Sequence, residues 1–236
     1  MKNTESSAVQ WHIEEDRSLL ASRLAGHVST WLLAALALRE RASLALSGGS
    51  TPGPFLAALS RQALPWARID VVPVDERWVA PDSDQANERL IRKMLLVGEA
   101  SRARFFPLLG REVSVEQQAR QADRRLVELH RPLDVAVMGM GDDAHTASWF
   151  PRSSGLEEAL SEDSERRCVA TGAPTEPVQR LTLTWPLIRE ARRCAVLIHG
   201  EQKKRRLQQV LDESGDVQDE PVRVLLQRPL SIYWSA

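Results

Sequence analysis

The sequence predicts an α/β fold, a three-layer, Rossmann-like arrangement in which helices cover both faces of a mainly parallel sheet. Two observations predict it. Short apolar stretches of strand length alternate along the chain with longer stretches of helical spacing, an order typical of parallel sheets. The 236 residues, 43% of them hydrophobic, also suffice to bury a large core without metals or disulfides. We expect a single domain over residues 1–236, with room for a small lid subregion.

The first half of the chain begins with a predicted helix at residues 14–39, because Leu20, Leu24 and Val28 fall on one stripe at helical spacing. A short apolar run at 43–46 is the first predicted strand, and a glycine-rich turn follows it. The same patterns then predict a helix at 54–61, a strand at 69–74, a helix at 84–96, a short strand near 105–106 and a helix at 115–130.

The second half contains the clearest strand, residues 133–138, with no charge between Asp134 and Asp142. Residues 152–167 have the most loop-like composition. The remaining predicted elements are strands at 168–171, 195–199 and 230–234, and a helix at 201–211 that opens after Gly200.

Composition excludes several classes of protein. Lysine and arginine total 31 against 32 aspartates and glutamates, a formal net charge of −1, which argues against a general nucleic-acid binder. The longest apolar run, 31–38, is shorter than the roughly 18 residues of a membrane helix, and the first ten residues lack a secretory signal. Cys168 and Cys194 are spaced for neither a zinc site nor a disulfide framework. We expect a cytoplasmic monomer or weak homo-oligomer without nucleic-acid or membrane partners.

Ligands of parallel sheets bind at the carboxyl ends of the strands. Four predicted strand ends carry polar or glycine-rich sequence: residues 47–51, 75–78, 139–145 and 199–203. We therefore expect the functional side chains to come from these four segments.

The Ser-Gly-Gly-Ser-Thr sequence at 47–51 joins a strand to a helix, where glycines admit a ligand and N–H groups favour an anion. An ordinary tight turn with a Ser/Thr cap is the alternative. The segment is not a P-loop, because no Gly-Lys-Ser/Thr follows. It is not a nucleophile elbow either, because Pro52 stands two residues after Ser50.

Residues 139–144 formally match the dinucleotide fingerprint G-x-G-x-x-G/A, but Asp142 and Asp143 would repel a pyrophosphate. The alternative is that this loop presents His145 as a base, or holds it as a capping or core histidine. We expect His12 at the surface and His27 in helix packing.

Arg77 stands at a strand end, where it either clamps a phosphate or carboxylate or belongs to a solvated turn. Lys203, one of four lysines in the chain, opens a helix and is either a ligand or a surface lysine.

Together these motifs resemble those of the bacterial 6-phosphogluconolactonases, in the superfamily that includes the glucosamine-6-phosphate deaminases. The resemblance covers nearly the whole chain. It rests on the motifs at 46–52, 75–77 with Asn87, 139–151, 180–184 and 200–203, of which 139–151 is the most specific.

The resemblance implies hydrolysis of 6-phosphoglucono-δ-lactone, without a metal or organic cofactor. It implies that His145 is the general base and that Asp143 orients either His145 or a substrate hydroxyl. The residues expected to hold the sugar phosphate are Ser47, Gly48, Gly49, Ser50, Thr51, Arg77, Arg180 and Lys203.

The chain departs from the family pattern at Ala144, where glycine is usual, and at Ala86, where serine is usual. If position 144 requires a positive φ, alanine costs about 1–2 kcal/mol there.

Two alternative functions share the same fold. An amino-sugar phosphate deaminase/isomerase would need a carboxylate shortly after His145, and residues 146–151 contain none. A non-catalytic sugar-phosphate sensor would have no need of His145.

Overall fold

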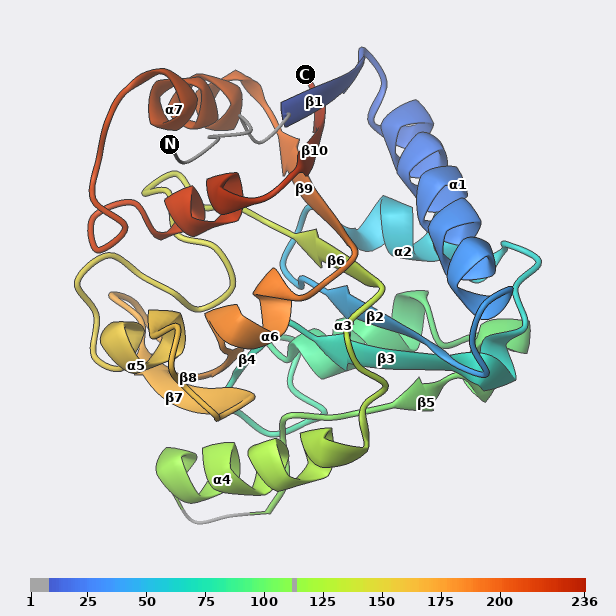
Figure 1. Ribbon diagram of the computed structural model, residues 1–236, viewed down its shortest axis with the longest axis horizontal. Coiled ribbons are helices and arrows are strands. Elements are labelled where there is room, and N and C mark those ends of the chain that lie inside the picture. The colour runs from blue at the N-terminus through green and yellow to red at the C-terminus, as the bar shows by residue number, and fades with distance from the viewer. Residues whose placement is uncertain (1–8, 112–113) are drawn as a thin grey trace, which may run out of the picture.

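The computed structural model describes residues 9–111 and 114–236, whose largest feature is a seven-stranded sheet (Figure 1). Its strand order is β1–β10–β9–β6–β2–β3–β5, and every neighbouring pair is parallel. The predicted mainly parallel sheet is therefore confirmed. The strands are β1 (Val9–Glu14), β2 (Ala42–Leu46), β3 (Ile69–Pro73), β5 (Arg104–Phe105), β6 (Val135–Met138), β9 (Arg193–His199) and β10 (Leu230–Ser235).

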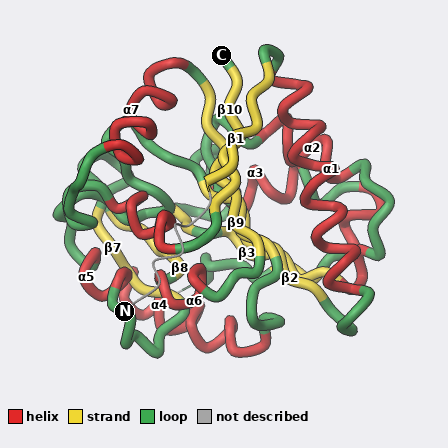
Figure 2. Tube along the Cα trace, turned by 45° about the horizontal axis from the view of Figure 1, so that its top comes forward, coloured by secondary structure: helices red, strands yellow, loops and turns green. Residues whose placement is uncertain are grey.

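Helices lie on both sides of this sheet, as Figure 2 shows for α1 and α2 on one side and α7 on the other. Alternate residues of a central strand point to opposite faces of the sheet and so belong to different hydrophobic cores. In β2, Leu44 and Leu46 belong to the core on the first side, under α1 and α2, and Ala45 belongs to the core on the second side. The first side carries α1 (Arg17–Leu36), α2 (Gly53–Ser60) and α3 (Asn87–Met94); the second carries α4 (Val115–Arg125), α6 (Trp185–Arg189) and α7 (Glu201–Asp212).

A second, three-stranded sheet was not predicted. It is antiparallel, in the order β4 (Asp75–Arg77), β8 (Gln179–Leu183), β7 (Cys168–Gly172). The predicted strand at 168–171 exists, but it pairs here and not in the main sheet. In the predicted loop at 152–167, the structure forms a short helix, α5 (Leu156–Leu160).

Helix α1 begins at Arg17, because residues 9–14 form strand β1 and Asp16 caps the helix by accepting N–H groups from Ser18 and Leu19. The predicted start at 14 was therefore wrong. Helix α1 has 20 residues and contains an 18-residue stretch with a mean hydropathy of 1.3, so it is long and apolar enough to cross a membrane, contrary to the expectation for this sequence. Half of its most apolar stretch is buried against the sheet and α2, which explains that composition.

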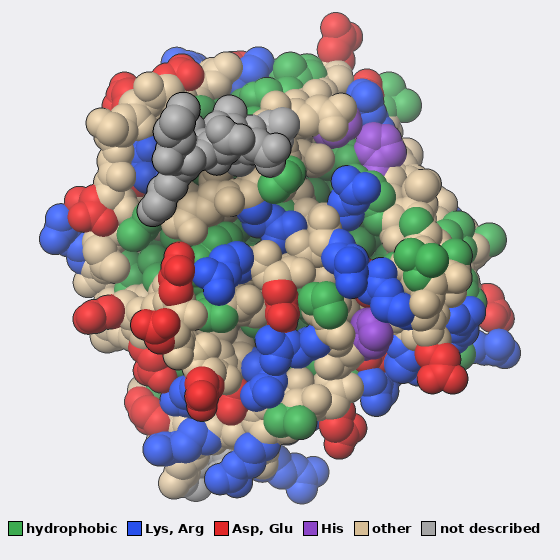
Figure 3. All heavy atoms as spheres, in the orientation of Figure 1, with side chains coloured by type: hydrophobic (Ala, Val, Ile, Leu, Met, Phe, Trp, Pro, Cys, Tyr) green, Lys and Arg blue, Asp and Glu red, His purple; other side chains and the backbone are tan. Residues whose placement is uncertain are grey.

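The surface carries both signs of charge. On the face shown in Figure 3, basic side chains gather along the middle while acidic ones are scattered among and around them. The near-zero net charge is thus a mixture of opposite charges, which leaves room for a small site of one sign.

Candidate active site

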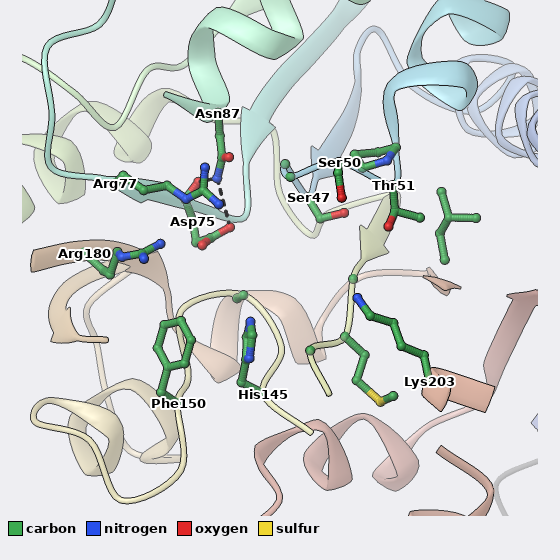
Figure 4. A pocket seen from close by; sticks show the side chains of 18 of the residues that line it. Ser47, Ser50, Thr51, Asp75, Arg77, Asn87, His145, Phe150, Arg180 and Lys203 are labelled. Atoms are coloured by element: carbon green, nitrogen blue, oxygen red, sulfur yellow. Dashed lines mark hydrogen bonds between the residues drawn. The ribbon is translucent and has the colours of Figure 1, made fainter. Parts of the chain in front are cut away.

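A cavity of about 360 Å³ opens at the carboxyl ends of the central strands, between the main sheet and the small sheet. Of the ten site residues predicted from the sequence, nine line it: Ser47, Gly48, Gly49, Ser50, Thr51, Arg77, His145, Arg180 and Lys203. The tenth, Asp143, lies behind His145 and is hydrogen-bonded to it. Figure 4 shows the labelled side chains converging on this space from segments that lie far apart in the sequence.

The loop at residues 47–51, which we call the anion loop, follows β2 and leads into α2. Gly48 has no room for a side chain, because a Cβ there would lie 1.9 Å from Oδ1 of Asn87; Gly49 has a φ of +88°. The N–H groups of residues 48–51 donate to no other described group of the protein. Free N–H groups at the start of a helix form a suitable cradle for an anion.

His145 follows β6 on a tight loop, and its position is fixed by Asp143. The carboxylate Oδ1 accepts from Nδ1 of the imidazole at 2.5 Å and from the His145 backbone N–H at 3.1 Å. Partial burial raises the pKa of Asp143, but the hydrogen bonds and charge of His145 outweigh it, so the pKa is lowered. An ionised Asp143 selects the tautomer with a proton on Nδ1, which leaves Nε2 free to accept a proton.

The loop that carries His145 is held in an unusual conformation. Three of its residues that are not glycine have positive φ: Ala144 (64°), Ala147 (50°) and Arg152 (51°). Ala144 therefore adopts the left-handed conformation that the family's glycine suggests, and the chain tolerates a local cost of about 1–2 kcal/mol. Gly141 is required, because a Cβ there would lie 2.1 Å from the His145 ring.

Strand β4 carries the Asp-Glu-Arg motif, and its middle residue, Glu76, turns away from the cavity and is fully buried. Its carboxylate accepts the backbone N–H groups of Arg77 (2.8 Å), Asn87 (2.7 Å) and Glu88 (2.6 Å). It thereby caps α3, whose own N-cap residue, Ala86, offers no side-chain acceptor. Burial raises the pKa of Glu76 to about 7 despite these donors.

Arg77 and Arg180 lie directly opposite each other on β4 and β8. Each is held by a backbone carbonyl, Arg77 by Gln85 at 2.6 Å and Arg180 by Pro177 at 2.7 Å. Burial, followed by the charge of Arg77, lowers the pKa of Arg180. In Figure 4 the two arginines lie across the cavity from Lys203, so the positive charge comes from two sides.

Asp75, Asn87 and Phe150 are among the cavity-lining residues that were not predicted as site residues. Asp75 accepts from Ser148 Oγ at 2.6 Å and from Asn87 Nδ2 at 3.3 Å, and its side chain faces the same way as that of Arg77. Strand alternation places Asp75 and Arg77 on the same side, a signal that can be used only once residues 75–77 are known to form a strand.

Phe150 contacts two predicted site residues. Its ring centroid is 4.2 Å from that of His145, and the Arg180 guanidinium carbon lies 5.6 Å from the same ring. Its position near the end of the 139–151 motif is the sequence feature from which Phe150 could have been predicted as a cavity residue.

Comparisons with known proteins agree on one family. The family model described as glucosamine-6-phosphate isomerases/6-phosphogluconolactonase matches residues 15–234. A 6-phosphogluconolactonase of Rhizobium meliloti (strain 1021) is 44% identical over 227 residues, 95% of this chain and 97% of the relative. A 6-phosphogluconolactonase of Pseudomonas aeruginosa is 44% identical over 217 residues, 91% of this chain and 90% of the relative.

Solved structures are similar as well. The crystal structure of a 6-phosphogluconolactonase from Shewanella baltica OS155 superposes with a TM-score of 0.93 at 38% identity, covering 98% of this chain and 99% of that one. A monomeric glucosamine-6-phosphate deaminase reaches a TM-score of 0.76 at 17% identity, covering 96% of this chain and 97% of that one. That second likeness shows the shared fold alone.

Proposed function

Because the chain belongs to the glucosamine-6-phosphate isomerase/6-phosphogluconolactonase family, we propose that it hydrolyses 6-phosphoglucono-δ-lactone to 6-phosphogluconate. This is the activity that the sequence motifs predicted, and it belongs to the oxidative pentose phosphate pathway. The observation that carries it is that His145, hydrogen-bonded to Asp143 at 2.5 Å, lines the same cavity as the anion loop and Lys203. A base and an anion site in one polar cavity suit a phosphorylated, hydrolysable sugar derivative.

The base acts first. Nε2 of His145 accepts a proton from a water molecule as the water oxygen bonds to C1 of the lactone. The electrons of the C1=O double bond move to the carbonyl oxygen and form a tetrahedral oxyanion. When that intermediate collapses, the bond between C1 and the ring oxygen breaks, and the ring oxygen takes the proton from His145. The products are the C1 carboxylic acid, which ionises, and a C5 hydroxyl. General-base help of this kind is worth about 10²- to 10⁴-fold in rate.

The other residues bind and orient the substrate. The N–H groups of the anion loop and the ammonium group of Lys203 hold the phosphate, which is remote from C1 and fixes the position of the ring. Arg77 and Arg180 supply further positive charge to this anionic substrate. Asp143 orients His145 through its hydrogen bond, and this role is favoured over contact with a substrate hydroxyl because Asp143 does not line the cavity.

A deaminase activity is less well supported. Asp75 is the one carboxylate among the described cavity-lining residues, and its oxygens already accept from Ser148 and Asn87. The relatives that share over 40% identity are named as lactonases. We further propose that the enzyme is a cytoplasmic monomer or weak homo-oligomer that needs neither nucleic acid nor membrane.

The test is a coupled assay with freshly generated 6-phosphogluconolactone, in which 6-phosphogluconate formation is followed by its oxidation. The rate is corrected for spontaneous hydrolysis of the lactone. We expect turnover well above the blank, at a rate proportional to enzyme concentration. A rate no faster than the blank would contradict the proposed function.

A further inference from the structure

Arg17, the first residue of α1, contacts the anion loop from outside the cavity. Its Nη2 donates to the carbonyl oxygens of Ser50 at 2.7 Å and Thr51 at 3.1 Å. Arg17 does not line the cavity, and more than thirty residues separate it from the loop along the chain. Figure 1 shows α1 and α2 side by side, which brings the start of α1 to the loop that precedes α2.

The two hydrogen bonds fix the direction of a peptide group. In a trans peptide the C=O of one residue and the N–H of the next point in opposite directions, and the peptide between Ser50 and Thr51 is trans. Because Arg17 holds the Ser50 carbonyl outside the cavity, the N–H of Thr51 points the other way, and Thr51 lines the cavity. Without Arg17 this peptide group would be free to turn its carbonyl oxygen toward an anion.

Arg17 also differs from a neighbouring arginine in its charge environment. Among the described residues, Arg17 forms no ion pair, whereas Arg23 on the same helix pairs with Glu14 at 2.6 Å. Its Nε is buried and has no partner within the described part of the chain. A positive charge directly behind the loop therefore adds to the potential that an anion experiences in front of it.

From these contacts we infer that Arg17 is a positioning residue for the substrate phosphate: it holds the anion loop with its N–H groups toward the cavity. The inference rests on the proposed function for the identity of the anion. It assigns a role in phosphate recognition to a residue that touches no substrate.

The test compares Arg17→Met with Arg23→Met, a matched loss of one arginine on the same helix. The first readout is the dissociation constant of inorganic phosphate, measured from phosphate-dependent protection against thermal unfolding. The second is selectivity, the ratio of kcat/KM for 6-phosphogluconolactone to kcat/KM for unphosphorylated gluconolactone. Arg17→Met should weaken phosphate binding and lower selectivity by about 10-fold each, because the two hydrogen bonds from a charged donor that hold the loop are lost. Arg23→Met should do neither.

Arg17→Lys keeps a positively charged donor and should recover part of the phosphate binding and part of the selectivity. It therefore provides a second test of the inference if Arg17→Met folds poorly. Equal losses on the two lactones with an unchanged phosphate constant would show a general structural role and overturn the inference. So would a phosphate constant that Arg17→Met leaves unaltered. A wild-type protein that binds phosphate but hydrolyses no lactone would instead refute the proposed function, and the phosphate readout would still test Arg17.

Discussion

Two histidine environments in this protein differ in the groups next to the imidazole ring. His145 opens onto the cavity and is hydrogen-bonded to a carboxylate, that of Asp143. His12 and His27 lie at the edge of the main sheet, where His12 stacks on Tyr233 at 4.4 Å and His27 Nδ1 lies 2.5 Å from the Tyr233 hydroxyl. Burial, followed by the charge of Arg23, lowers the pKa of both.

The difference shows what makes a histidine suitable as a base. A carboxylate next to an imidazole favours the protonated ring, whereas desolvation and a neighbouring arginine oppose protonation. His12 is also 6% exposed, so the expectation that it lies at the surface was wrong. Its place in β1, a strand the sequence did not reveal, is the reason.

The largest effect should come from removing His145, the proposed base. We expect His145→Gln to lower kcat on 6-phosphogluconolactone by about 10²- to 10⁴-fold, because no other described cavity residue is an imidazole. Binding of 6-phosphogluconate should change little, since the phosphate contacts remain. His12→Gln is the control and should retain nearly full activity. Turnover of His145→Gln close to that of wild type would refute the assignment.

Removing the carboxylate should have the next largest effect. Asp143→Asn loses the charge-assisted hydrogen bond that selects the Nδ1 proton, and we expect kcat to fall by about 10- to 100-fold. Asp142→Asn changes the neighbouring exposed carboxylate and serves as the control. Steady-state rates and the pH dependence of kcat measure the effect. Equal activities of the two variants would show that Asp143 does not act through His145.

The ring contact should have a smaller effect. Aromatic contacts of this kind are worth about 0.5–1.5 kcal/mol, so Phe150→Leu should lower kcat by about 3- to 10-fold through a less ordered His145. Phe150→Tyr keeps the ring and should restore most of the loss. A rise in KM alone would place the effect on Arg180, the other group that contacts the ring.

The smallest effect is on stability in acid. The pKa values of His12 and His27 are lowered from 6.5 in the folded state. As the pH falls below 6.5, these histidines therefore bind protons in the unfolded protein before they do so in the folded protein. Stability should therefore be fully present above pH 6.5 and decline as the pH falls through the folded pKa values. His12→Phe keeps the stack on Tyr233 without the titration, so its denaturation midpoint should decline less between pH 7.5 and 5.5. An identical decline would exclude His12 as a source.

The centre of the parallel sheet was predictable because its strands are continuous apolar runs, such as the one at 133–138, whereas β1 at the edge is not such a run. The site loops were predictable because strand ends of parallel sheets carry ligands, which brought residues 47–51 and His145 together. These signals are local in the sequence.

The small sheet was not predictable in the same way. Asp75–Arg77 is a three-residue strand whose partner, Gln179–Leu183, lies about a hundred residues further along the chain. Such a short charged segment has no periodicity to read, and its pairing depends on tertiary structure. The capping of α3 by Glu76 depends on that pairing too, and so does the use of Asp75 in the cavity.

The facing pair of Arg77 and Arg180 links the stability of this enzyme to its own ligands. Two like charges directly opposite on neighbouring strands oppose folding, and an anion in the cavity relieves that repulsion. A ligand present at 100 times its dissociation constant adds about 2.7 kcal/mol to the stability of the form that binds it. The free energy of unfolding should then rise with the concentration of any anion that binds between these two arginines.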